Sequence, residues 1–371
     1  MSTETHLPDL ASRLEETLMS SGYSDDIPFH QSHFTPIGGD MGAARQDFRV
    51  TEIPAYMPCG SGEHLYLWIE KEGRSSQDVT KAVEKAFNVK EIHVGCAGKK
   101  DVNAITRQWI SVQTPEDGKE AIEALNDYGW MRVLDVSRHT NKLRMGHLRG
   151  NRFAVNLYDV TASDQEIAQA CDALSRDGFL NYFGKQRFGF DGSNVAQGIR
   201  ILSGGRASHQ MKKLYVSALQ SAIFNLTIAR RYRAHGLDVL EGDVLQKHNA
   251  GCFVCTDPET DQARALNGEV TVTHALPGKK VMHGSGYTET LESSVIHDLF
   301  TYWAARSSEG EPEFSSLSRL ADGTRRPMWI RAENIQFVRK SVNDISIEFV
   351  LPAGCYATVF LRHLCGASFT R

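Results

Sequence analysis

The chain is organised around residues 93–108, HVGCAGKKDVNAITRQ. The apolar run Ile92–Cys96 predicts a short buried strand, and Gly98 permits a turn directly after it. Two lysines and a single carboxylate, Asp101, follow that turn. One carboxylate among cations and amide side chains at the end of a strand is typical of a site that binds a polyanion. The alternative is a solvated loop in which Asp101 caps a turn.

The composition limits the class of protein. A length of 371 residues predicts two or three domains with a sizeable core. There is no apolar run long enough to span a membrane and no pattern of a secretory signal at the start. The seven cysteines are an odd number and are scattered along the sequence, as in proteins of a reducing compartment. We therefore expect a cytoplasmic protein with free thiols and no membrane partner.

The net charge of −4 conceals one strongly basic segment, residues 138–152, which contains no carboxylate. Unpaired cations are what contacts to phosphate require, so this segment is a candidate nucleic-acid surface. The alternative is an ordinary solvated face. The candidate RNA contacts, inside and outside this segment, are Arg45, Lys100, Lys142, Arg144, Arg149, Lys185 and Arg187.

The periodicity of apolar residues predicts strands and helices that alternate without a strict strand–helix–strand repeat. This pattern favours an α+β fold with a mixed or antiparallel sheet. The first two strands could pair as a hairpin. Capping boxes are predicted at Ser75 and Ser163, and Gly178 is the expected left-handed end of a helix. The expected strands are 47–53, 64–69, 92–96, 105–112, 130–136, 151–160, 336–339 and 345–351. The expected helices are 10–18, 75–88, 118–125, one that follows the Ser163 cap and ends before Gly178, 208–235, 288–305 and a last one after Thr358.

A second dense segment, residues 181–189, reads NYFGKQRFG. Aromatic side chains beside cations are typical of sites that stack a base and hold a phosphate. The alternative is a turn with core aromatics. Cys252 and Cys255 form a lone CxxC without two further ligands at a suitable spacing, so no zinc site is expected. The lysines after Gly98 do not complete a phosphate-binding P-loop.

Taken together, these segments resemble the TruD family of tRNA pseudouridine synthases. The resemblance runs through five separated motifs in family order, from about residue 46 to residue 362, which is far more specific than any one motif. The first motif holds Ala97, Gly98, Lys100, Asp101, Ala104, Thr106 and Gln108; the others are residues 181–189, Asp47-Phe48 with Val50 and Glu52, Gly150-Asn151 with Phe153, and residues 351–358 without Cys355.

The resemblance implies that uridine in tRNA is isomerised to pseudouridine without a cofactor or metal. It assigns Asp101 as the catalytic carboxylate and implies that the target base is flipped out of its stack. The usual family substrate is the uridine at position 13 of certain tRNAs, glutamate tRNA among them. Contacts to the flipped uracil are implied for Phe48, Asn181, Phe183 and Tyr356.

The family architecture implies a catalytic domain built from residues 1–206 and 331–371, with residues 207–330 as an inserted α/β domain specific to the family. Because the site would be complete within one chain, we expect a monomer that needs no protein partner. One departure stands out: the family usually has a lysine near Gly42, and Arg45 is the candidate to replace it. An RNA-binding protein or RNA chaperone, or the same chemistry on another RNA, are the competing hypotheses.

Overall fold

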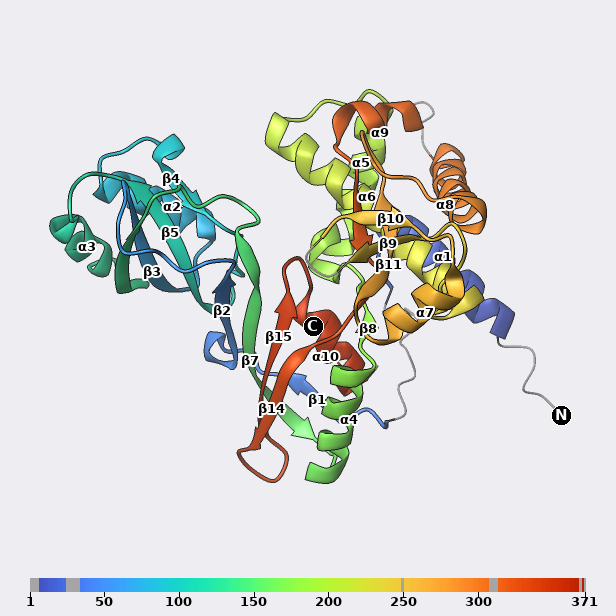
Figure 1. Cartoon of the computed structure of the whole chain (residues 1–371), viewed down its shortest axis with the longest axis horizontal. Helices are drawn as coiled ribbons and strands as arrows, with labels where there is room; N and C mark the ends of the chain where they lie inside the picture. The colour runs from blue at the N-terminus through green and yellow to red at the C-terminus, as the bar shows by residue number, and fades with distance from the viewer. Residues whose placement is uncertain (1–6, 25–33, 248–249, 307–312, 367–368, 370–371) are drawn as a thin grey trace. The chain divides into compact units, whose positions relative to one another are not determined.

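The structure is a computed structural model that describes residues 7–24, 34–247, 250–306, 313–366 and 369. The chain divides into two compact units, each built from two segments (Figure 1). Unit 1 comprises Met1–Gln31 and Gly178–Ile330, and unit 2 comprises Ser32–Asp177 and Arg331–Arg371.

This division differs from the expected boundaries at residues 206 and 331. The Asn225 amide nitrogen donates to the carbonyl oxygens of Gly22 and Phe183, at 2.9 and 3.0 Å. These bonds tie the N-terminal segment and the 181–189 segment to the same long helix, so both belong to unit 1. The assignment of functions to residues 1–206, 207–330 and 331–371 stays a prediction.

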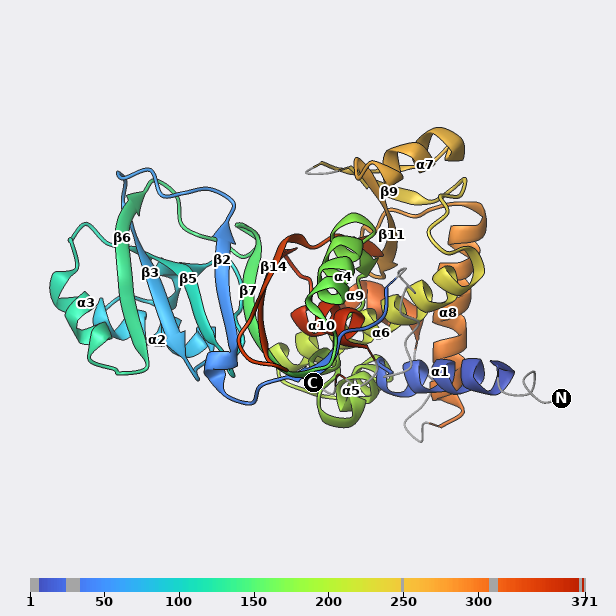
Figure 2. The same ribbon diagram turned by 90° about the horizontal axis from the view of Figure 1, so that it is seen from below.

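In the described part of unit 2, nine strands form one sheet, in the order β14-β15-β7-β2-β5-β3-β6, with β1 beside β7 and β4 beside β5. Figure 2 shows β6, β3, β5, β2 and β7 side by side. β2 and β5 are parallel and the other pairs are antiparallel, which confirms the expected α+β fold with a mixed sheet. The strands are β1 (Gly38–Met41), β2 (Phe48–Pro54), β3 (His64–Glu72), β4 (Val94–Cys96), β5 (Ile105–Gln113), β6 (Met131–His139), β7 (Leu148–Val160), β14 (Glu333–Arg339) and β15 (Ile345–Pro352).

The core of unit 2 follows from the alternation of apolar residues along these strands. Phe153, Val155 and Leu157 of β7 are all buried, as their period of two predicts. The Phe153 ring lies between those of Phe48 and Phe349, at centroid distances of 5.9 and 5.3 Å. The helices of unit 2 are α2 (Ser76–Ala86), α3 (Lys119–Asn126), α4 (Asp164–Arg176) and α10 (Ala357–Cys365). The capping boxes at Ser75 and Ser163 are confirmed.

Two expectations about strands are wrong. β2 and β3 do not form a hairpin, because β5 lies between them and pairs with both. Pairing with β5 buries β3 in the interior of the sheet, which local sequence alone does not specify. The strand expected from Ile92 begins at Val94, since the three residues Glu91–His93 form a 3-10 turn in which Ile92 is 72% exposed.

Unit 1 is built around α6 (His209–His235), which packs against α1 (Leu7–Ser21), α5 (Ser193–Leu202) and α8 (Gly286–Ala304). Residues of α6 from Val216 to Arg231 are mostly buried on all sides, as expected for a central helix. The other described elements of unit 1 are α7 (Pro258–Leu266), α9 (Phe314–Leu320), the antiparallel sheet β10-β9-β11-β12 (Cys252–Val254, Val244–Lys247, Val270–Leu276, Thr324–Pro327) and the short pair β8 (Phe179–Leu180) and β13 (Trp329–Ile330).

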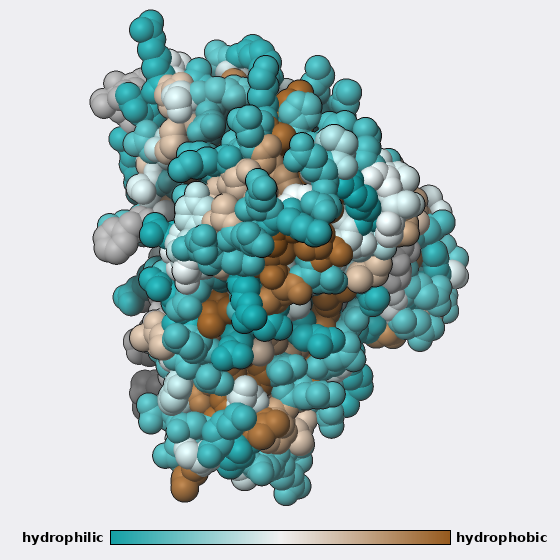
Figure 3. Space-filling model, turned by 90° about the vertical axis from the view of Figure 1, so that its left-hand side faces the viewer, coloured by the Kyte–Doolittle hydropathy of each residue, from teal (hydrophilic) through white to brown (hydrophobic). Residues whose placement is uncertain are grey.

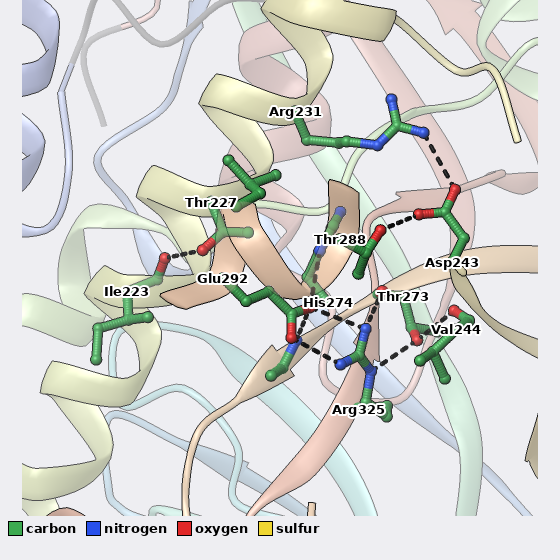
Figure 4. A network of polar contacts seen from close by, with 12 residues as sticks. Ile223, Thr227, Arg231, Asp243, Val244, Thr273, His274, Thr288, Glu292 and Arg325 are labelled. Carbon is green, nitrogen blue, oxygen red and sulfur yellow. Dashed lines mark hydrogen bonds and ion pairs between the residues drawn. The ribbon is translucent and has the colours of Figure 1, made fainter. Parts of the chain in front are cut away.

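A buried network of charged groups joins α8 to this small sheet (Figure 4). Glu292 accepts from Arg325 at 2.9 and 3.0 Å and lies 3.0 Å from the His274 ring nitrogen. Burial opposes ionisation of Glu292, but the bonds from His274 and Arg325 prevail and lower its pKa. Arg231 and Asp243 form a second buried pair at 3.2 Å. The pairing of Glu292 with Arg325 and His274 holds α8 on the sheet, while the pair of Arg231 and Asp243 holds α6 to the segment before β9.

The surface drawn in Figure 3 is mostly hydrophilic, with apolar side chains gathered in small patches. Small apolar patches on a hydrophilic surface are usual in folded proteins. Within the described residues, no helix has both the length and the apolar character needed to cross a membrane.

Candidate active site

The loop that carries Asp101 connects β4 to β5 and is fixed by hydrogen bonds to its backbone. Gly146 N–H donates to the Ala97 carbonyl at 2.8 Å, and the Gln108 amide donates to the Gly98 carbonyl at 3.3 Å. The backbone N–H of Lys100 donates to the Ser76 hydroxyl at 2.8 Å. The loop is therefore held from three sides, and Asp101 is not a residue of a freely solvated turn.

Lys71 is a residue beside Asp101 that sequence reasoning missed. The Lys71 ammonium donates to the backbone carbonyl of Asp101, and Lys71 is only 1% exposed. Burial lowers the pKa of Lys71 to about 8, although the charge of Asp101 favours the protonated form. A signal was present in the sequence: Lys71 occupies an inward position of β3, after Leu67 and Ile69. A lysine on the buried side of a strand needs a partner there.

Lys100 points away from solvent and pairs with Glu52. The ammonium and the carboxylate are 2.7 Å apart, and the two side chains are 2% and 0% exposed. The other Glu52 oxygen accepts from Trp109 N–H at 3.3 Å. Lys100 is therefore not free to contact a phosphate, and this part of the expected nucleic-acid surface is wrong. The family motifs around Glu52 and Lys100 meet in this one buried pair.

Asp101 is partly buried, and burial and the neighbouring charges have opposite effects on the pKa of its carboxyl. Burial raises the pKa of the carboxyl, while the positive charges of Lys71 and Lys100 act in the opposite direction. A carboxylate of this kind can serve as a nucleophile or as a general base. The described part of the chain contains no group of three or more His, Cys, Asp or Glu side chains arranged to hold a metal.

Gly42, where the family has a lysine nearby, has no room for a side chain. A Cβ there would lie 2.1 Å from the Asp47 carboxylate, which also accepts from Asn156 and Tyr158. Arg45 is exposed and its guanidinium lies 3.9 Å from Glu72. The charges that act on Asp101 are those of Lys71 and Lys100, so the expected role of Arg45 beside Asp101 is not supported.

The expected uracil contacts fall in both units. In unit 2, Phe48 is 8% exposed and stacks on Phe153, while Tyr356 is half-buried at the first turn of α10. In unit 1, Asn181 and Phe183 are both buried at the start of the 181–189 segment.

Arg326 organises the pair in unit 1. It donates to the Asn181 side-chain oxygen at 2.7 Å, and its guanidinium lies 4.0 Å from the centre of the Phe183 ring. The Asn181 amide nitrogen donates to the Pro327 carbonyl at 2.9 Å, so the orientation of the amide is fixed. Arg326 is a second residue that sequence reasoning missed, because it is distant in sequence from both partners.

The remaining expected phosphate contacts differ in accessibility. Lys142 donates to the Ile92 carbonyl, and Arg187 donates to the Ser221 hydroxyl at 3.2 Å. Arg149 pairs with Glu333 at 3.2 Å yet stays 69% exposed. Arg144 and Lys185 are exposed. The exposed members remain candidates for phosphate, while Lys142 also has a structural role.

Residues 26–205 and 203–364 match the family described as tRNA pseudouridine synthase D (TruD).

The chain belongs to the TruD family.

Named TruD relatives cover nearly the whole chain. The chain is 37% identical to tRNA pseudouridine synthase D of Anaeromyxobacter dehalogenans over 353 residues, which are 91% of this chain and 96% of the relative. It is 36% identical to tRNA pseudouridine synthase D of Thermus thermophilus, with 91% of each chain covered. As a TruD family member, it is an isomerase that converts uridine in tRNA to pseudouridine.

The TruD fold is confirmed by a solved structure, that of the putative tRNA pseudouridine synthase D (TruD) from Methanosarcina mazei. The two structures have a TM-score of 0.66 and 20% sequence identity. The match covers 94% of this chain and 96% of the other.

Proposed function

We propose that this enzyme isomerises the uridine at position 13 of glutamate-type tRNAs and that Asp101 is its catalytic carboxylate. The observation that carries the proposal is the Asp101 loop: a single enclosed carboxylate on a fixed backbone, with the Lys71 ammonium at its own carbonyl. Position 13 is supported only by the resemblance to the family.

The reaction breaks the bond between N1 of uracil and C1′ of the ribose and forms a bond between C5 and C1′. The proton on C5 is lost and N1 gains one, so no electrons are exchanged with a cofactor. Asp101 acts either as a nucleophile at C1′ or as a base on the sugar. Both roles need the ionised carboxylate. Burial raises the pKa of the Asp101 carboxyl above its ordinary value, and the charges of Lys71 and Lys100 limit that rise.

The target uridine must leave its stack to reach an enclosed carboxylate, which costs a few kcal/mol. We propose that Tyr356, Phe48, Phe183 and Asn181 receive the flipped uracil. Tyr356 is the most accessible of the aromatic residues. Phe48 and Phe183 are only 8% and 7% exposed, which limits each to contact by one edge of the ring. The fixed amide of Asn181 supports a hydrogen-bonding role toward the base edge.

Carbodiimide mapping of pseudouridine in bulk tRNA tests the proposal. Wild-type protein should produce a new stop at position 13 of glutamate tRNA. Asp101→Asn should abolish the stop and keep the affinity for tRNA. Asp117→Asn is the matched control, because Asp117 is an exposed aspartate of the same unit, 72% accessible at its side chain. Turnover by Asp101→Asn would refute the role of Asp101. A wild-type stop at another position would show that the enzyme modifies a different uridine.

We also propose that one chain forms the complete site, since every assigned residue comes from a single chain. Light scattering should give the mass of a monomer for the active species. Activity confined to a heavier species would contradict this.

A further inference from the structure

Unit 2 has a pocket that none of the residues assigned above line. It is an open, shallow hollow at the surface with a volume of about 310 Å³. We call it the α2 pocket. Its lining residues are Arg74, Asp78, Lys81, Ala82, Lys85, Tyr128 and Trp130.

The α2 pocket is positively charged. Arg74, Lys81 and Lys85 supply three positive charges and Asp78 one negative charge. In the described residues these three cations form no ion pair. Asp78 is already engaged as a helix cap, since its carboxylate accepts from the Ser75 N–H and hydroxyl at 2.9 and 2.7 Å. Besides these bonds from Ser75, the charges of Arg74 and Lys81 help to lower the pKa of the Asp78 carboxyl, so this one carboxylate offsets part of the charge of the three cations. An excess of exposed cations over carboxylates is what binding to a phosphate needs.

The spacing of the lysines is costly for the helix. Lys81 and Lys85 are four residues apart and exposed on the same face of α2, and like charges at this spacing destabilise a helix. The opposite face, with Val79 and Val83, is fully buried in the core. Folding accounts for the apolar face of α2 and, through the helix dipole, for Lys85 in the last turn, but not for a second lysine four residues before it. An anion bound between them would offset their repulsion.

The pocket also has an aromatic wall. The rings of Tyr128 and Trp130 meet edge to face at 5.5 Å, and Tyr128 is 39% exposed. The Arg74 guanidinium lies 5.8 Å from the centre of the Trp130 ring. An exposed aromatic ring beside cations matches the chemistry by which proteins stack an unpaired base and hold its phosphate.

The turn between β3 and α2 connects the pocket to the Asp101 loop. Lys71, at the end of β3, bonds to the Asp101 carbonyl, and Ser76, at the start of α2, accepts from Lys100 N–H. Arg74 lies between these two residues in the sequence. The charge of Asp78 also acts on Lys71. The same short turn therefore positions the candidate catalytic loop and one wall of the pocket.

We infer that the α2 pocket binds an unpaired nucleotide of the tRNA near the target uridine, with its phosphate on Lys81 and Lys85 and its base against Tyr128. The position of the target uridine in this inference rests on the proposed role of Asp101. Binding at this site would help to hold the opened RNA while the target base is flipped.

Steady-state kinetics on tRNA test the inference. The double variant Lys81→Ala/Lys85→Ala should raise KM about tenfold with kcat within about twofold of wild type, because it weakens substrate binding and leaves the chemistry intact. The plot of log kcat/KM against log salt should become less steep, by about 0.7 for each phosphate that the variant no longer neutralises. Lys119→Ala is the matched control, since Lys119 is an exposed lysine of the same unit outside the pocket.

The aromatic wall has its own test. Tyr128→Ala should raise KM about tenfold, and Tyr128→Phe should restore it, because the ring and not the hydroxyl stacks on the base. If the lysine and tyrosine variants all match Lys119→Ala, the inference is wrong.

Photo-crosslinking separates this inference from the proposed function. Transcribed tRNA containing 4-thiouridine should crosslink to the segment of Tyr128 and Trp130, and the double lysine variant should reduce the yield. Asp101→Asn should keep the crosslink while losing product. Crosslinks confined to other segments would overturn the inference even if the enzyme is active. Absence of pseudouridine with the crosslink retained would instead refute the proposed reaction at Asp101.

Discussion

The buried pair between Lys100 and Glu52 allows a quantitative test of what holds the Asp101 loop. We consider Lys100→Met, which keeps most of the side-chain volume and removes the charge. The ammonium and carboxylate are 2.7 Å apart, with side chains 2% and 0% exposed. After the substitution the Glu52 carboxylate stays in the interior, and its one remaining partner among the described residues is the Trp109 N–H at 3.3 Å.

The loss of stability in Lys100→Met follows from two opposing contributions, the attraction between the two charges and the cost of removing them from water. At 2.7 Å and an effective dielectric constant of about 20, the gross attraction is about 6 kcal/mol. Desolvation of both ions offsets much of this attraction in the wild type. Removing one partner leaves the desolvation of the other uncompensated, and such changes cost about 3–5 kcal/mol. That loss is a large part of a typical unfolding free energy of about 5–15 kcal/mol.

Native-state hydrogen exchange can measure the loss locally. Amides of β5 should exchange with an opening free energy about 3–5 kcal/mol lower in Lys100→Met than in wild type. Amides of α6 serve as the internal reference, because α6 belongs to unit 1. Lys119→Met is the control, since Lys119 is exposed and pairs with Asp117 at 3.6 Å. Such surface pairs contribute about 0–1 kcal/mol.

The double variant Lys100→Met/Glu52→Gln sharpens the test. It replaces the ion pair by two neutral side chains and should regain most of the lost stability. The reasoning is refuted if Lys100→Met stays within about 1 kcal/mol of the Lys119→Met control. It is also refuted if the double variant is as unstable as the single one, because an unpaired buried charge would then not be the cause.

Three further predictions concern the surroundings of the site and unit 1. Lys71→Met removes a charge that lowers the pKa of Asp101, so the acid limb of the kcat–pH profile should move to higher pH; an unchanged limb would refute this coupling. Gly42→Ala places a Cβ 2.1 Å from the Asp47 carboxylate and should destabilise unit 2 by about 1–3 kcal/mol in urea unfolding, whereas Ala43→Gly, at an exposed neighbour, should not. Glu292 has a lowered pKa in the folded state, so the stability that it contributes is present above its unfolded pKa and is lost as pH falls below about 4.5. Glu292→Gln should therefore destabilise unit 1 at pH 7 and lessen its acid sensitivity, as monitored by exchange of α6 amides.

The elements with strong local signals were predictable. Ser75 and Ser163 cap helices because a hydroxyl satisfies backbone amides within the same turn, which requires no distant partner. The alternation in β7 predicts its buried face for the same local reason. The neighbours of β2 were not predictable, because a strand can pair with any other strand that offers a complementary edge. The position of β5 between β2 and β3 depends on the pairing of all strands in the sheet and not on local sequence.

The candidate site divides in the same way. The sequence by itself determined the family and singled out Asp101, because several short motifs in a fixed order carry that information without any coordinates. Only the tertiary structure decided the partners of Asp101 and Lys100. Lys71 and Glu52 lie on other strands, and hydrogen bonds across the sheet bring them to the loop. Burial and charge pairing depend on which strands meet, so the electrostatics of the site are a property of the folded chain.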